Sequence, residues 1–239
     1  MQRRTPIFIV TSSRPRVGKT LIARALTEYF CVQKRPVAAF DVNPDEFKLI
    51  DHLPAYTAAA SLNDTRGEMG LFDQLVLEDA VPKVVDLSHQ LLDRFFSVMQ
   101  QIDFTTEVRR RAIAPMVLFV ADPDERSRQG YAMLRDRFPN LPLVPVLNDN
   151  VQRVGAYRAN FPPTRLGGEP VSIPALTPVV RSVVDRRNFS FIGYVQKTND
   201  RTSELYEWMG RVFIAFRELE TRLLFGATVP RLRLSLIHI

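Results

Sequence analysis

The sequence contains few residues that form disulfides or bind zinc. Among its 239 residues it has one cysteine, Cys31, and three histidines, His52, His89 and His238, which stand far apart. A single thiol cannot form an internal disulfide, and the histidines lack the spacing of zinc ligands. These scarcities argue against a disulfide-stapled scaffold and against a zinc enzyme.

Long apolar runs are also missing. The longest purely apolar stretches, such as Met116 to Ala121, are far shorter than the roughly 20 residues that a membrane-spanning helix needs. The basic start, Met1 to Thr5, is not followed by the apolar core and small-residue cleavage site of a signal peptide. We therefore expect a cytoplasmic protein without a membrane partner.

What is present is typical of a folded domain with a basic surface. The residues are 46% hydrophobic and 24% charged, and the formal net charge is +6. This composition is ordinary for a globular protein. A basic balance favours contact with nucleic acid, anionic lipid or phosphate ligands, although an arginine-rich soluble surface would look the same.

Short apolar runs alternate with helical patterns along the chain, which predicts an α/β fold with a mostly parallel sheet and helices on both faces. We expect one domain over residues 1–230. Residues 231–239 are a tail, either a genuine apolar end or non-native sequence. The segment 52–69 is expected to be a surface segment or a mobile loop, and the segment 150–168 is expected to be a loop. The predicted strands are 6–11, 36–40, 81–87, 115–121, 143–147 and 169–173, and the predicted helices are 18–33, 88–101, 124–138, 176–185 and 202–225.

A phosphate-binding loop is expected between the first strand and the first helix. Residues 13–20, SRPRVGKT, fit the pattern G-x-x-x-x-G-K-[ST] except that Ser13 replaces the first glycine. Lys19 would reach the β- and γ-phosphates, and the Thr20 hydroxyl would ligate Mg²⁺. Backbone N–H groups at a helix N-terminus would hold the phosphates. The residues expected to bind the nucleotide are Ser13, Arg16, Val17, Gly18, Lys19, Thr20 and Leu21.

This loop, TSSRPRVGKT, resembles the deviant Walker A loop of the ParA/MinD ATPases and, less closely, the loop of dethiobiotin synthetase. The resemblance implies a P-loop NTPase-like three-layer sandwich that binds ATP and Mg²⁺. It places Arg14 at the signature lysine, which in that family crosses a dimer interface to the partner's nucleotide. Arg14 could also serve only its own subunit. Pro15 and Arg16 stand where the family has two glycines, and Pro15 removes one N–H donor.

Acidic and amide residues stand at the ends of the predicted strands. Asp41 and Asn43 resemble the family's D-x-D-P segment, which implies that Asp41 lies near the Mg²⁺ and takes part in catalysis with Lys19 and Arg14. Asn43 replaces the second acid and cannot accept a proton as a carboxylate can. Asp86 resembles a Walker B metal ligand. Asn148 resembles the asparagine that reads adenine. Each of these positions could instead be an ordinary turn.

Three functions remain open from the sequence. The first is a ParA/MinD-like ATPase of slow turnover, a nucleotide-dependent homodimeric switch that positions DNA or other cargo. The second is a nucleotide-binding scaffold with little hydrolysis, which Ser13, Pro15 and Asn43 favour. The third is a ligase similar to dethiobiotin synthetase. It is the poorer match, because that family has a lysine after the second strand, where this chain has Asp41 and Asn43, with Lys48 further on. No guanine-binding Asn-Lys-x-Asp motif occurs. The arginine clusters, such as 109–111, are either a non-specific DNA surface or merely solvated.

Overall fold

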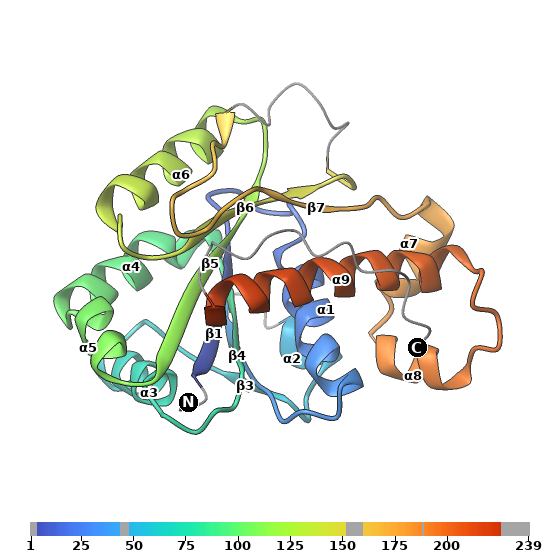
Figure 1. The fold of residues 1–239 in the computed structure, drawn as a ribbon, viewed down its shortest axis with the longest axis horizontal. Helices are drawn as coiled ribbons and strands as arrows, with labels where there is room; N and C mark the ends of the chain where they lie inside the picture. Colours follow the sequence, from blue (N-terminus) through green and yellow to red (C-terminus); the bar gives the residue numbers. More distant parts are fainter. Residues whose placement is uncertain (1–3, 44–47, 152–159, 188, 226–239) are drawn as a thin grey trace.

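The computed structural model describes residues 4–43, 48–151, 160–187 and 189–225. Its centre is a seven-stranded sheet in the order β3-β2-β4-β1-β5-β6-β7 (Figure 1). All of the strand pairs are parallel. The strands are β1 (Thr5–Thr11), β2 (Ala38–Val42), β3 (Thr57–Ala59), β4 (Lys83–Leu87), β5 (Ile113–Ala121), β6 (Leu143–Asn148) and β7 (Val171–Ile173).

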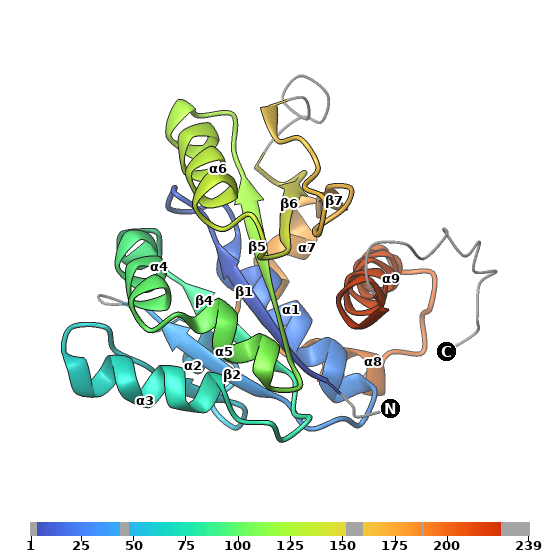
Figure 2. The ribbon, with the colours of Figure 1, turned by 60° about the vertical axis from the view of Figure 1, so that its left-hand side comes forward.

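Helices cover both faces of this sheet, so the domain has three layers (Figure 2). One face carries α1 (Lys19–Val32), α8 (Phe191–Lys197) and α9 (Glu204–Phe225), with the short helices α2 (Leu49–His52) and α7 (Pro178–Val184) contributing to the same core. The other face carries α3 (Thr65–Leu75), α4 (Leu92–Gln101), α5 (Phe104–Arg110) and α6 (Glu125–Arg137). A 3₁₀ turn, η1 (His89–Leu91), leads into α4.

The central strand β1 shows why its sequence is continuously apolar. Phe8 and Val10 pack into the core under α1 and α9, whereas Ile7 and Ile9 pack into the core under α3 to α6. All four side chains are 0% exposed. A strand that is buried on both faces has no solvent side, so the alternation typical of a half-exposed strand is lost. The α/β three-layer fold predicted from the sequence is therefore confirmed.

The segment 52–69 was predicted as a surface segment or a mobile loop. Most of its residues are exposed, but the loop alternative was wrong, since the segment contains β3 and the start of α3. The strand has only three residues, too few to show a periodicity. Asp64 caps α3 by accepting a hydrogen bond from the Gly67 N–H at 2.8 Å, a signal that the sequence does contain. Helices α5 and α8 were also missed. In 150–168, residues 152–159 lie outside the described part, as does the proposed tail 231–239.

A buried ion pair attaches the last third of the chain to α1. Arg24 is 2% exposed and Glu28 is 0% exposed, and they lie 3.4 Å apart. The Arg24 guanidinium donates to the backbone carbonyls of Val184 at 2.8 Å and Phe189 at 2.9 Å. Glu28 accepts a hydrogen bond from the Ser190 hydroxyl at 2.7 Å. The helix that follows the phosphate loop is thus fixed by residues that come about 160 positions later.

We expect Arg24→Met to lower the free energy of unfolding by about 3–5 kcal/mol, because it leaves the Glu28 charge buried without its partner. Urea denaturation measures this change. Arg128→Met is the matched control, since Arg128 forms an exposed pair with Glu125 on α6 and such pairs contribute about 1 kcal/mol or less. Equal losses in the two variants would show that the buried pair does not hold the C-terminal segment.

Among the helices of the described residues, none is both long enough and apolar enough to cross a bilayer.

Candidate functional site

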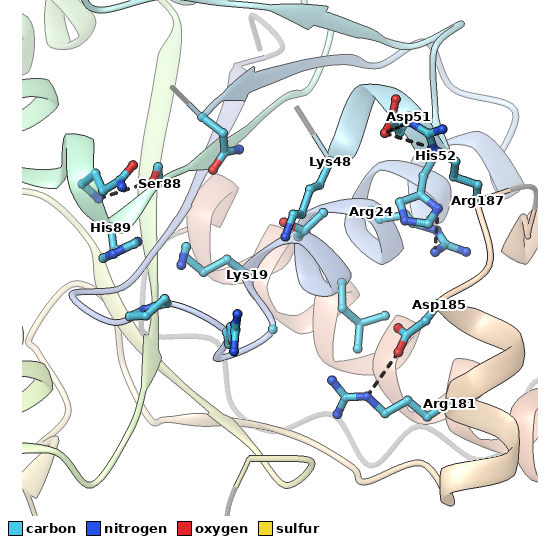
Figure 3. A pocket seen from close by; sticks show the side chains of 17 residues that line it. Lys19, Arg24, Lys48, Asp51, His52, Ser88, His89, Arg181, Asp185 and Arg187 are labelled. Carbon is cyan, nitrogen blue, oxygen red and sulfur yellow. Dashed lines mark hydrogen bonds and ion pairs between the residues drawn. The ribbon is translucent and has the colours of Figure 1, made fainter. Parts of the chain in front are cut away.

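A cavity of about 710 Å³ lies beyond the carboxyl ends of β1 and β4. The chain leaves β1 through α1 on one face of the sheet and leaves β4 through α4 on the other. Such a switch point is where open parallel sheets bind their ligands. The cavity extends from the phosphate loop across α1 to α2 and α7, and its wall includes the segment Ser88 to Gln90 that follows β4 (Figure 3).

The wall of this cavity is strongly basic. Six of its side chains are cationic and two are carboxylates, which gives a net charge of +4 if the histidines are neutral. Asp51 is paired with Arg187 at the rim, and Asp185 is paired with Arg181. The excess of positive charge suits an anionic ligand. The cationic side chains are Arg16, Lys19, Arg24, Lys48, Arg181 and Arg187.

The loop between β1 and α1 has the backbone conformation of a turn that enters a helix. Gly18 precedes α1 with a φ of 93°, and Arg16 also has a positive φ, 59°. A Cβ atom on Gly18 would lie 2.3 Å from the Asn148 side-chain nitrogen. Glycine is therefore required at position 18 both by its backbone angle and by the lack of space. Arg16 adopts the left-handed conformation at one of the positions where the family loop has glycine.

Lys19 lies in the cavity and is only 8% exposed. Its ammonium group donates to the backbone carbonyl of Arg14 at 2.9 Å, so it lies across the loop. Burial lowers the pKa of Lys19, the Asp86 carboxylate raises it, and the Lys48 ammonium lowers it. Figure 3 shows Lys19 and Lys48 extending into the same space from different elements. An anion between the two ammonium groups would relieve their repulsion.

Thr20 and Asp86 are in contact with each other, and Asp86 is close enough to Lys19 to interact with its charge. The Thr20 hydroxyl donates to one carboxylate oxygen of Asp86 at 2.7 Å. The other oxygen is buried and has no hydrogen-bond partner among the described residues. The pKa of Asp86 is raised to about 6, mainly by burial and also by the Asp41 charge, although the hydrogen bond from Thr20 and the charge of Lys19 lower it. A hydroxyl beside a carboxylate with a free oxygen fits Mg²⁺, which prefers oxygen ligands, keeps several waters and needs few protein groups.

Asp41 has a different set of contacts from the one expected. One of its oxygens accepts the backbone N–H groups of Leu49 at 2.7 Å and Ile50 at 3.1 Å. The other accepts a short hydrogen bond from the Asn43 side chain. Asp41 therefore holds the start of α2, while it pairs with Asp86 in the sheet register. Its role as a metal-site and catalytic residue stays a prediction, which requires that it exchange some of these bonds.

Asn148 binds the phosphate loop directly. Its side-chain nitrogen donates to the Val17 carbonyl at 2.9 Å, and its oxygen accepts from the backbone and side chain of Asn150 at 3.1 Å each. The residue is 1% exposed. The sequence interpretation missed this loop-supporting role, because nothing in the sequence shows that the end of β6 contacts residue 17. Contact with adenine stays a prediction.

Arg14, at the position of the signature lysine, is turned towards α6. Its guanidinium lies 3.6 Å from the Asp124 carboxylate, and its side chain is 33% exposed. Asp124 is the residue before α6 and also accepts a hydrogen bond from the Arg126 N–H at 2.9 Å. Within this chain Arg14 therefore has an intramolecular partner, and its use across a dimer interface stays a prediction.

The far half of the cavity contains residues that the sequence did not single out as a site. His52, at the end of α2, contacts the Arg24 guanidinium through Nδ1 at 3.2 Å. Burial and the Arg24 charge lower the pKa of His52, and the hydrogen bond to the Arg187 backbone and nearby carboxylates raise it. These residues come from α1, α2 and the segment after α7, so only the tertiary fold brings them together.

Comparisons with known proteins address the fold. No protein-family model matches the sequence, and no curated protein matches it. The structure is similar to that of a ParA family ATPase from Chlorobium tepidum TLS, with a TM-score of 0.50 and 12% identity, over 89% of this chain and 98% of that chain. It is also similar to the MinC:MinD cell division protein complex of Aquifex aeolicus, with a TM-score of 0.49 and 12% identity, over 96% and 98% of the two chains.

The chain is thus an α/β protein with a parallel sheet covered by helices on both faces. Its fold is like that of the ParA family ATPase, in agreement with the ParA/MinD-like P-loop fold that its loop sequence implied.

Proposed function

We propose that this protein binds ATP with Mg²⁺ in the basic cavity and acts as a slow ATPase of the ParA/MinD kind. The observation that carries the proposal is the Thr20–Asp86 hydrogen bond next to a buried Lys19. One Asp86 carboxylate oxygen has no hydrogen-bond partner among the described residues. A hydroxyl, a carboxylate and an ammonium group in this arrangement are the side chains that a magnesium triphosphate needs.

Each part of the loop has a role in this proposal. Thr20 and Asp86 would hold the Mg²⁺, Asp86 through water, and the ion would neutralise charge on the β- and γ-phosphates. The backbone N–H groups of Arg16 to Leu21 would donate to the phosphates at the start of α1. Lys19 would exchange its bond to the Arg14 carbonyl for one to phosphate oxygens. Because the Mg²⁺, Lys19 and the backbone N–H groups would contact more than one phosphate group, we expect the site to bind a triphosphate in preference to a single phosphate.

The further role that we propose is a nucleotide-dependent homodimer that positions DNA or another cargo. Arg14 is the residue that would reach the partner's nucleotide, after release of its weak pair with Asp124. An arginine stays charged and can donate two parallel hydrogen bonds to phosphate. The net charge of +6 suits a non-specific contact with nucleic acid.

A second candidate is a nucleotide-binding scaffold with little hydrolysis. It is favoured by Asn43, which donates to Asp41 and approaches the Asp86 carbonyl at 3.5 Å. An amide there can orient water but cannot take its proton. The two candidates share the site and differ only in turnover.

One set of assays separates these functions. ATP turnover is measured with and without DNA, together with light scattering in the presence and absence of Mg²⁺-ATP. Turnover stimulated by DNA and a doubled mass with nucleotide support the switch. A doubled mass without turnover supports the scaffold. ATP consumption only when a small carboxylic acid is added supports a ligase instead, and an unchanged mass without turnover in every condition contradicts the proposal.

A further inference from the structure

Helix α6 has a glycine, Gly130, in its interior. Glycine in the middle of a helix costs about 0.5–1 kcal/mol relative to alanine. Its backbone angle does not require glycine, since its φ is not among the positive ones. The reason for a glycine at position 130 must therefore lie in the space around it.

That space is filled by the phosphate loop. A Cβ atom on Gly130 would lie 1.8 Å from the Ser13 hydroxyl oxygen, 3.0 Å from the Ser13 Cβ and 3.7 Å from the Phe119 ring. Two other helix-interior glycines differ: at Gly70 in α3 and Gly210 in α9, an added Cβ meets nothing within 4 Å. Gly130 is thus a close contact between α6 and the loop.

The contact falls on the residue where the loop departs from the motif. Ser13 replaces the first glycine of the phosphate-loop pattern. Its hydroxyl is buried and has no hydrogen-bond partner within the described part of the chain. The side chain lies against α6, so only the backbone of Ser13 is left for a phosphate. The next residue, Arg14, also contacts α6, through Asp124.

We propose that Gly130 is a positioning residue for the phosphate loop: the missing side chain on α6 makes room for the side chain that Ser13 adds to the loop. The inference rests on the proposed nucleotide site. Rotation of the Ser13 hydroxyl would relieve the 1.8 Å contact but not the 3.0 Å contact to its Cβ. A methyl group at position 130 therefore requires α6 and the Ser13 Cβ to separate by a few tenths of an ångström. We expect this shift to displace the Ser13 backbone, and with it the N–H groups that would hold the phosphates.

The test is a double-mutant cycle of wild type, Gly130→Ala, Ser13→Gly and the double variant. Mg²⁺-ATP affinity is measured by calorimetry and stability by urea unfolding. In the wild-type background, Gly130→Ala is expected to weaken ATP binding at least about tenfold, because small displacements of a binding loop have large effects. In the Ser13→Gly background the same change is expected to cost less than about twofold, since the atoms it would strike are gone.

Gly210→Ala is the matched control and is expected to leave ATP affinity unchanged. A Gly130→Ala protein that binds like wild type overturns the proposal, as does a double variant that loses as much as Gly130→Ala alone. If Gly130→Ala does not fold, the double variant still decides: it folds and binds like Ser13→Gly only if the two residues compensate. If wild type does not bind Mg²⁺-ATP, the proposed function fails, and the unfolding cycle alone decides whether Ser13 and Gly130 are coupled.

Discussion

Replacement of Lys19 by alanine is expected to weaken Mg²⁺-ATP binding by at least about a hundredfold, because truncating a buried charge that pairs with phosphate typically costs 2–5 kcal/mol or more. Lys19 is 8% exposed, and its ammonium group lies across the loop at the start of α1. No other group of the loop supplies a full positive charge from a buried position. Calorimetric titration of the variant with Mg²⁺-ATP measures the loss.

Lys197→Ala provides the control for this variant. Lys197 is exposed at the end of α8 and does not line the cavity. Its removal takes away the same charge from the whole protein, so it reports the effect of net charge alone, and we expect a change below about twofold. If Lys19→Ala binds ATP as tightly as Lys197→Ala does, the cavity is not the nucleotide site.

Asp86→Asn is expected to have two opposite effects. It removes the carboxylate that would hold Mg²⁺, so ATP affinity should become almost independent of Mg²⁺. It should also stabilise the ligand-free protein at neutral pH. Burial raises the pKa of Asp86 from 3.8 to about 6, and the folded state therefore binds its proton more tightly than the unfolded state does. Its favourable contribution is present below about pH 4 and is lost as pH rises through about 6.

The gain in the free energy of unfolding for Asp86→Asn should therefore be larger at pH 8 than at pH 4, by a difference on the order of 3 kcal/mol. Urea unfolding at the two pH values measures it, and titration with ATP in Mg²⁺ or in EDTA measures the metal effect. Asp73→Asn, an exposed residue of α3, is the control in both. A variant that keeps a Mg²⁺-dependent affinity would show that the ion binds elsewhere.

The core of the fold could be read from local patterns. Runs such as 115–121 are buried on both faces and are therefore apolar throughout, which the sequence shows directly. The position of the loop between β1 and α1 was equally accessible, because Gly18, Lys19 and Thr20 are neighbours that stand between a strand pattern and a helix pattern. That this loop binds phosphate stays a prediction.

Contacts between distant segments could not be read in this way. The partner of Thr20 is 66 residues away at Asp86 and that of Arg24 is 160 residues away at Val184. Asp86 was still predicted as a site residue, since an acid near the end of a strand is a known pattern, whereas the role of Asn148 as a support for the loop was not predicted. Its contact with Val17 depends on how β6 lies relative to β1, and no local pattern encodes this.

Two of the residues that differ from the family loop have neighbours in or next to α6. Ser13 lies against Gly130, and Arg14 pairs with Asp124. In the sequence, Ser13 counted towards a site with little hydrolysis, whereas Arg14 matched the position of the signature lysine. The structure adds that both side chains are held against α6, which no local pattern shows.

Hydrogen exchange of the wild-type protein with and without Mg²⁺-ATP reports both whether the nucleotide binds and where it binds. We expect slower exchange of the backbone amides from Ser13 to Leu21 when Mg²⁺-ATP is present, and a smaller effect when EDTA replaces Mg²⁺. Unchanged exchange in this turn at millimolar nucleotide, or protection confined to another part of the domain, would contradict it.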